Sequence, residues 1–120
     1  RSDYLMIKRN PDMVREIRSN MRGGNGNVEI CHIFKPEELK GKTRLYAKIT
    51  LEPGCSIGLH EHVGEEEIYY ILKGVATVND NGNISTLYPG DAVLTGNGAS
   101  HSIENNGSET LELMALILLY

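Results

Sequence analysis

The stretch from Gly54 to Gly74 reads GCSIGLHEHVGEEEIYYILKG and carries the strongest pattern in the chain. It holds two histidines, His60 and His62, separated by a single residue. Residues i and i+2 of a β-strand point to the same face, so both imidazoles would face one side of a strand. This stretch therefore predicts a strand that presents two nitrogen ligands to one metal ion.

An acidic segment follows these histidines after a turn at Val63-Gly64. In a returning strand, Glu67 and Tyr69 share one face, whereas Glu65 and Glu66 lie nearer the turn. The strand parity thus favours Glu67 as the carboxylate that points the same way as the buried side chains.

A second segment supplies another histidine, His101, after a glycine-rich turn that contains Gly96 and Gly98. Three imidazoles and one carboxylate form a mixed nitrogen and oxygen set that suits manganese, iron, nickel, copper or zinc. In an octahedral shell such a set leaves two positions open for substrate or water, as metal catalysis requires. By contrast His32 has no such motif around it, and we interpret it as an ordinary surface or core residue.

The remaining sequence indicates an all-β fold. Residues 45–51 alternate between apolar and polar side chains, and turn signals recur along the chain, including the hairpin signal at residues 79–83. A proline after Asn10, followed by apolar residues at helical spacing, predicts a short helix over about residues 11–19. The glycine-rich segment 23–27 leads into an alternating, strand-like sequence, so a phosphate-binding loop is rejected.

Length and composition limit the classes of function. The 120 residues suffice for a single domain, and 12 basic against 16 acidic side chains give a net charge of −4. Nucleic acid is therefore not an expected partner, and the arginines at positions 9, 15, 18 and 22 are interpreted as a solvated face. The apolar run 111–120 is too short to span a membrane and is expected to form a buried terminal strand. Two widely spaced cysteines, Cys31 and Cys55, favour reduced thiols and a cytoplasmic location.

These residues resemble the paired motifs of the cupin family. The first motif, G-x5-H-x-H-x4-E-x6-G, matches from Gly54 to Gly74, and the second, G-x5-P-x-G-x2-H-x3-N, matches from Gly90 to Asn105, with Gly96 in place of the usual proline. The chain is also similar to bacterial single-domain cupins described as putative oxalate decarboxylases. The resemblance implies a double-stranded β-helix, a small jelly-roll barrel, formed by residues 41–120. A short N-terminal helix, a glycine-rich loop and a first strand within residues 1–40 would pack on it.

The resemblance also implies a site. The metal ligands of the family fall on His60, His62, Glu67 and His101, with manganese as the expected metal, and Asn105 falls at a structural position. Glu66 is the alternative carboxylate if the spacing is one residue shorter. An oxalate decarboxylase reaction would need a cation for the second carboxylate and a general acid.

Candidates for these further roles come from the same region. Arg44, Lys48 or an N-terminal arginine could bind the substrate carboxylate, and Glu65, Glu66 and Tyr69 are the candidate catalytic residues. For Tyr69, a buried position with a local hydrogen bond is the competing interpretation. The alternatives to a decarboxylase are an iron-dependent dioxygenase and a non-catalytic cupin that binds a sugar or a small acid. Both faces of the strand 113–119 are apolar, so a homodimer is expected.

Overall fold

The computed structural model describes residues 6–120, which form ten strands and three short 3-10 turns. The turns are η1 (Asn10–Asp12), η2 (Met21–Gly23) and η3 (Pro36–Glu38). The strands are β1 (Val14–Ser19), β2 (Asn27–His32), β3 (Thr43–Leu51), β4 (Ser56–Glu61), β5 (Glu65–Lys73), β6 (Ala76–Asp80), β7 (Asn83–Leu87), β8 (Ala92–Gly96), β9 (Ser100–Glu104) and β10 (Leu111–Leu119). No helix among residues 6–120 is both long and apolar enough to cross a membrane.

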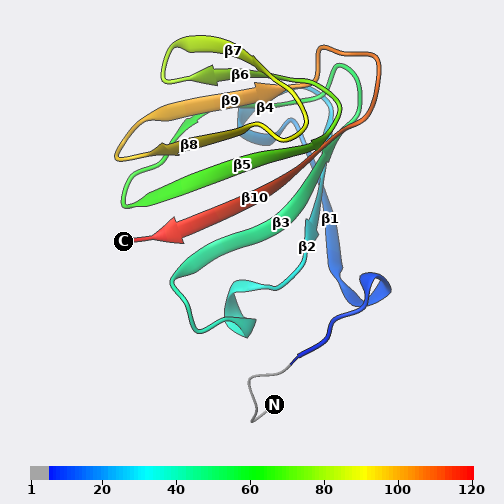
Figure 1. Ribbon diagram of the computed structural model, residues 1–120, viewed down its shortest axis with the longest axis vertical. Coiled ribbons are helices and arrows are strands. Elements are labelled where there is room, and N and C mark those ends of the chain that lie inside the picture. Colours follow the sequence, from blue (N-terminus) through cyan, green and yellow to red (C-terminus); the bar gives the residue numbers. More distant parts are fainter. Residues whose placement is uncertain (1–5) are drawn as a thin grey trace.

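The strands build two antiparallel sheets that face each other (Figure 1). The larger sheet has the order β1-β2-β3-β10-β5-β8, and the smaller sheet has the order β4-β9-β6-β7. This arrangement confirms the predicted all-β jelly-roll barrel. In Figure 1 the smaller sheet closes over only one end of the larger sheet, so that β1 and β2 extend beyond it.

The core lies between the two sheets and comes from alternate residues of each strand. Ile49, Leu113 and Ile71 lie side by side on β3, β10 and β5, and each is at most 2% exposed. The terminal strand predicted from the apolar run is confirmed as β10, at the centre of the larger sheet. The predicted hairpin is confirmed as well, because Asn81 and Gly82 take the positive φ angles that a tight turn between β6 and β7 requires.

The helix predicted over residues 11–19 is wrong. Only Asn10–Asp12 form a helical turn, and residues 14–19 form β1, which pairs with β2 from Val14 opposite His32 to Ser19 opposite Asn27. An isolated helix of this length is marginal in water, and pairing with a sheet edge satisfies the same backbone groups. The glycine-rich segment does lead into a strand, β2, as expected.

Candidate metal centre

Three strands bring the four predicted metal ligands together. His60 lies on β4 directly opposite His101 on β9, and His62 follows the end of β4. The backbone N–H of His62 donates to Ala99, which keeps this residue in line with β9. Glu67 lies on β5, in the facing sheet, with its side chain 4% exposed. The barrel therefore supplies ligands from both of its walls.

The donor atoms of this cluster lie close to one another. His101 Nε2 is 2.9 Å from His62 Nε2 and 3.0 Å from His60 Nε2. Glu67 Oε1 is 3.0 Å from Nε2 of both His62 and His101. All four ligand atoms lie within 4.8 Å of one another. The cluster is thus positioned for a single metal ion.

Hydrogen bonds at the far side of the rings orient two of the imidazoles. His60 Nδ1 is 2.7 Å from the carbonyl oxygen of Gly58, which can only accept, so Nδ1 carries the proton. His62 Nδ1 likewise donates to Glu65 at 2.9 Å. In the neutral form of both rings, Nε2 then carries a lone pair and lies close to Nε2 of His101, at 2.9 Å for His62 and 3.0 Å for His60. Such a cluster requires a positive charge at its centre, which a divalent cation supplies.

The ionisation of the cluster agrees with this requirement. Burial raises the pKa of Glu67, but hydrogen bonds from His101 and His62 outweigh it and lower the pKa to about 2. The hydrogen bond to Glu67 raises the pKa of His62, because the carboxylate stabilises positive charge there. Burial lowers the pKa of His60. The carboxylate is therefore ionised, and the site favours a cation.

Glu65 lies outside the ligand cluster, on the side of the His62 ring that carries Nδ1. Its carboxylate accepts from His62 and also from Arg44, with Arg44 Nη2 at 2.8 Å and Nε at 3.1 Å. The hydrogen bond from Arg44 is the main cause that lowers the pKa of Glu65. Ligating histidines commonly donate their second N–H to a carboxylate, which fixes the tautomer and raises the basicity of the ligand. Glu65 has the position of such an orienting group.

Tyr69 packs beneath the cluster. Its ring stacks on His101 with centroids 4.8 Å apart and an interplanar angle of 7°, and the residue is 1% exposed. Burial, followed by the negative charge of Glu67, raises the pKa of Tyr69 well above its ordinary value. The phenol therefore stays protonated and supports the plane of the His101 ring.

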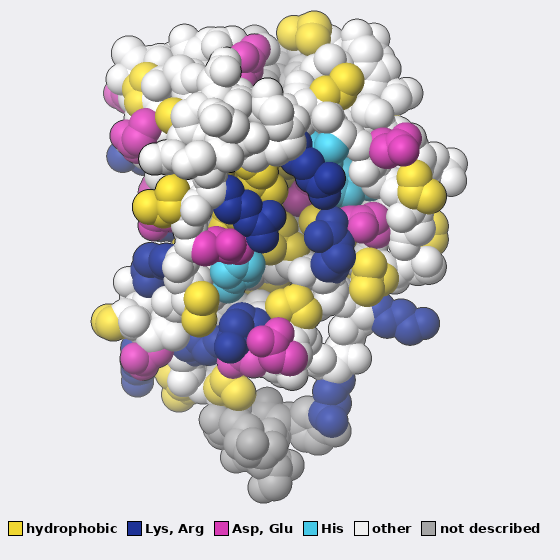
Figure 2. All heavy atoms as spheres, turned by 180° about the vertical axis from the view of Figure 1, so that it is seen from behind, with side chains coloured by type: hydrophobic (Ala, Val, Ile, Leu, Met, Phe, Trp, Pro, Cys, Tyr) yellow, Lys and Arg dark blue, Asp and Glu magenta, His cyan; other side chains and the backbone are white. Residues whose placement is uncertain are grey.

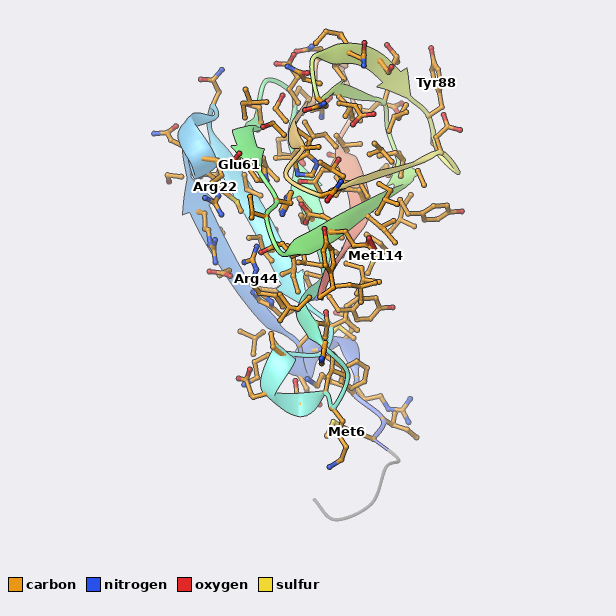
Figure 3. All side chains as sticks on the ribbon, turned by 90° about the vertical axis from the view of Figure 1, so that its left-hand side faces the viewer. Met6, Arg22, Arg44, Glu61, Tyr88 and Met114 are labelled. Atoms are coloured by element: carbon orange, nitrogen blue, oxygen red, sulfur yellow. The ribbon has the colours of Figure 1, made fainter. Side chains whose placement is uncertain are left out.

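A cavity of about 120 Å³ opens beside the cluster. Its walls include apolar side chains of both sheets, such as Ile49 and Ile57, together with His60, His62 and Glu67. Arginines 18, 22 and 44 also line it. Figure 2 shows basic side chains gathered around a hollow with an apolar floor, and Figure 3 shows Arg22 and Arg44 on the same side of the barrel. The cavity thus joins a cluster suited to a cation with a rim suited to an anion.

Some of the residues predicted to bind substrate or to act in catalysis lie at the cavity, and others do not. Lys48 does not reach the cavity: it lies on the outer face of β3, 3.7 Å from Glu112. Glu66 is one residue out of phase with Glu67 and belongs neither to the cluster nor to the cavity lining. Of Arg44 and Lys48, only Arg44 lies at the cavity. Alternation turns Lys48 and Glu66 to the outer face of the sheet, whereas Arg44 lies where the pairing of β3 with β10 shifts register, between Ile117 and Leu118.

Three further cavity residues were not singled out in the sequence analysis. Arg18 and Arg22 were interpreted as part of a solvated face, although an unspecified N-terminal arginine was named as a candidate carboxylate ligand, and His32 was assigned no role. All three line the cavity. His32 Nε2 is 2.7 Å from Glu16, which also accepts from Arg18 at 3.2 Å. The sequence contained a pattern that could have indicated this, because positions 14, 16 and 18 share one face if the segment is a strand. The pattern was not recognised because a helix was expected there.

Gly96, where the family motif usually has proline, has a structural explanation. A Cβ atom at this position would lie 2.6 Å from Cβ of Glu66 and 3.2 Å from the carbonyl oxygen of Glu65. No side chain fits there without moving the start of β5, which carries the orienting carboxylate.

Comparison with known proteins gives a consistent result. The family model for the cupin domain matches residues 47–117. An "oxalate-binding protein" of Thermotoga maritima is 47% identical over 114 residues, which cover 95% of this chain and 94% of that protein. A crystal structure described as a "predicted oxalate decarboxylase" from Thermotoga maritima superposes with a TM-score of 0.91 at 47% identity, over 96% of this chain and all of the other.

A solved structure of lower sequence identity has the same fold. The polyketide cyclase RemF of Streptomyces resistomycificus superposes with a TM-score of 0.76 at 19% identity, over 95% of this chain and 80% of its own. At this level of identity the likeness concerns the fold alone, and function has to be argued from the site.

Proposed function

The chain belongs to the cupin family, and on that premise we propose that it is a metal-dependent cupin that binds a small carboxylate related to oxalate. One observation carries the proposal: four converging metal-ligating side chains and a rim of arginines share one small cavity. A metal at the cluster and guanidinium groups at the rim both attract anions. The cavity of about 120 Å³ is far smaller than the roughly 300–1,000 Å³ of pockets for drug-sized ligands.

The proposed metal ligands are Nε2 of His60, His62 and His101 and a carboxylate oxygen of Glu67. Three imidazoles and one carboxylate suit a divalent transition metal, and we propose manganese, with iron, nickel, zinc or copper as alternatives. When bound, the metal would act as a Lewis acid that holds and polarises a carboxylate oxygen. The residues around it have defined tasks: Gly58 and Glu65 orient two of the rings, and Tyr69 supports the third.

The names of the relatives support the ligand class. The 47% identical protein of Thermotoga maritima is named for oxalate binding, and the solved structure from the same organism, also at 47% identity, is described as a predicted oxalate decarboxylase. The identity extends over nearly the whole of this chain. Oxalate is a dianion with six heavy atoms, which matches both the cationic rim and the small size of the cavity.

Binding without turnover is better supported than decarboxylation. Decarboxylation requires a group that delivers a proton to the carbon that loses carbon dioxide, as in C2O4²⁻ + H⁺ → HCO2⁻ + CO2. Glu67 is the acidic side chain in the cavity lining, and it faces the metal site as a carboxylate. Glu65 is held ionised by Arg44, and Glu66 points away. None of these three carboxyl groups is placed to act as the general acid.

Calorimetry with the metal-loaded protein tests this function. We expect oxalate to bind to the manganese-loaded chain and to bind far more weakly after chelation. Release of formate and carbon dioxide would make the protein a decarboxylase, and turnover of a catechol or diketone by the iron-loaded form would make it a dioxygenase. Equal oxalate binding with and without metal contradicts the proposed function.

We also propose that the chain forms a homodimer through the outer face of the larger sheet. Tyr46, Leu116, Ile68 and Leu94 are cross-strand neighbours there on β3, β10, β5 and β8. Leu94 is 58% exposed in a single chain. A second copy would bury this apolar row against its own equivalent, as a two-fold interface requires.

We propose a cytoplasmic location because of the state of the two cysteines. Cys31 and Cys55 are free thiols, the state that a reducing compartment maintains.

A further inference from the structure

Arg22 sits in η2, the turn that links β1 to β2, and its side chain lines the cavity beside the metal cluster. Its backbone has φ 55° and ψ 30°, in the left-handed region that arginine rarely adopts. Such a conformation persists only where the surrounding structure enforces it, and it is common at ligand-binding sites. The contacts of this turn show what enforces it here.

Backbone packing clamps the glycine-rich segment onto β4. A Cβ atom on Gly24 would overlap the carbonyl oxygen of Ser56, and a Cβ atom on Gly58 would overlap the carbonyl oxygen of Arg22. The backbone N–H of Ser56 donates to Asn25 at 2.8 Å, and the N–H of Asn25 donates to the Ser56 hydroxyl at 2.8 Å. The segment is therefore not a loose loop, and it carries Arg22 to a defined place.

The same β4 residue contacts both the arginine and a metal ligand. The carbonyl of Gly58 accepts from His60 Nδ1 at 2.7 Å, and its Cα faces the backbone of Arg22. The spacing between the Arg22 backbone and the metal ligand His60 is thus set by a single residue. A binding site of fixed spacing can distinguish a ligand with two charged ends from a ligand with one.

Arg22 is also distinguished by its charge. Among the arginines that line the cavity, Arg18 is paired with Glu16 and Arg44 is paired with Glu65. Arg22 makes no hydrogen bond or ion pair to any residue within 6–120. Burial raises the pKa of Tyr69, and Arg22 is the positive side chain that opposes this shift, so its charge acts inside the barrel. Its guanidinium is available to a ligand.

We propose that Arg22 is the specificity-determining residue that binds the outer carboxylate of a dicarboxylate whose inner carboxylate binds at the metal centre. The inference rests on the proposed function. It adds that the selectivity for a dianion comes from the N-terminal segment, outside the residues 47–117 that match the family. Arg18 and Arg44 contribute positive potential, but their carboxylate partners occupy the geometry that a second carboxylate would need.

Calorimetry with manganese-loaded Arg22→Gln tests the proposal, with oxalate and acetate as ligands. Loss of one charge-assisted, bidentate contact should weaken oxalate binding about 10- to 100-fold. Acetate affinity and manganese stoichiometry should remain unchanged, because acetate has no second carboxylate and Arg22 is not a ligand. Arg22→Lys should recover part of the oxalate affinity. The matched control is Arg15→Gln, since Arg15 lies on the opposite face of β1 and outside the cavity.

Each result has a distinct meaning. Oxalate binding by Arg22→Gln within about twofold of the wild type overturns the role of Arg22 and leaves the proposed function intact. An equal loss of oxalate and acetate affinity also overturns it, because the arginine would then act on the metal site as a whole. Absence of oxalate binding to the manganese-loaded wild type contradicts the proposed function and this inference together.

Discussion

Replacing Glu65 with glutamine should weaken metal binding although Glu65 is not a metal ligand. The substitution leaves the size of the side chain unchanged, but it removes the negative charge that accepts from His62 Nδ1 at 2.9 Å. It also removes the ion pair with Arg44 at 2.8 Å. His62 is 2% exposed, so its ring has no water to replace the lost partner.

The magnitude follows from which of these contacts is buried. Arg44 is half exposed, so its ion pair contributes only about 0–1 kcal/mol. The buried, charge-assisted bond from His62 contributes about 1.5–3 kcal/mol. Loss of such an orienting carboxylate typically lowers metal affinity about 10- to 100-fold, which corresponds to about 1.4–2.7 kcal/mol. Arg44→Gln should produce a smaller loss, since Glu65 keeps its charge.

The affinity can be measured by titration with Mn²⁺ while the free ion is followed by electron paramagnetic resonance. Glu66→Gln is the matched control, because Glu66 adjoins Glu65 in sequence but points away from the cluster, and its affinity should stay within about twofold of the wild type. Unchanged affinity in Glu65→Gln, or an equal loss in Glu66→Gln, would refute the orienting role.

The remaining predictions concern stability and assembly. Asn105→Ala should lower the free energy of unfolding in urea by about 3 kcal/mol. The reason is that the buried Asn105 amide donates to Leu51 and Glu109 and accepts from Gly107. A loss below about 0.5 kcal/mol would contradict this. Chelation of the metal should lower the melting temperature by on the order of 10 °C if the metal is present at about 100 times its dissociation constant. An unchanged melting temperature would mean that the metal does not bind the folded state preferentially. Leu94→Glu should convert the dimer to a monomer in sedimentation. Ile84→Glu should not, because Ile84 is 67% exposed, against 58% for Leu94, but lies on β7 of the smaller sheet. A wild type that sediments as a monomer refutes the dimer.

The sequence predicts three of the ligands, His60, His62 and Glu67, because the information for them is local. Strand parity places His60 and His62 on one face of a strand, and it places Glu67 on the inner face of the strand that returns after the turn at Gly64. The sequence displays this parity directly. Two of the ligands, His60 and His101, are 41 residues apart, and only the paired motifs of the family indicated that they meet. The structure places them as cross-strand neighbours.

The cationic part of the cavity was harder to predict. Arg18, Arg22 and His32 reach it only because residues 14–19 join the larger sheet as an edge strand, and that pairing depends on contacts with β2 and not on local propensity. Met13, Val14 and Ile17 fit a helical spacing equally well, so the alternation of Glu16 and Arg18 went unrecognised. Likewise, Lys48 looked suitable by charge, but its phase on β3 turns it to the outer face.

The central claim is that His60, His62, Glu67 and His101 bind one metal ion, and elemental analysis tests it most directly. Protein purified without chelators should contain close to one transition-metal ion per chain, and the double variant His60→Ala/His62→Ala should contain almost none. His32→Ala should keep its metal, because His32 lines the cavity but is not part of the cluster. A double variant that retains the metal at the wild-type level would contradict the account.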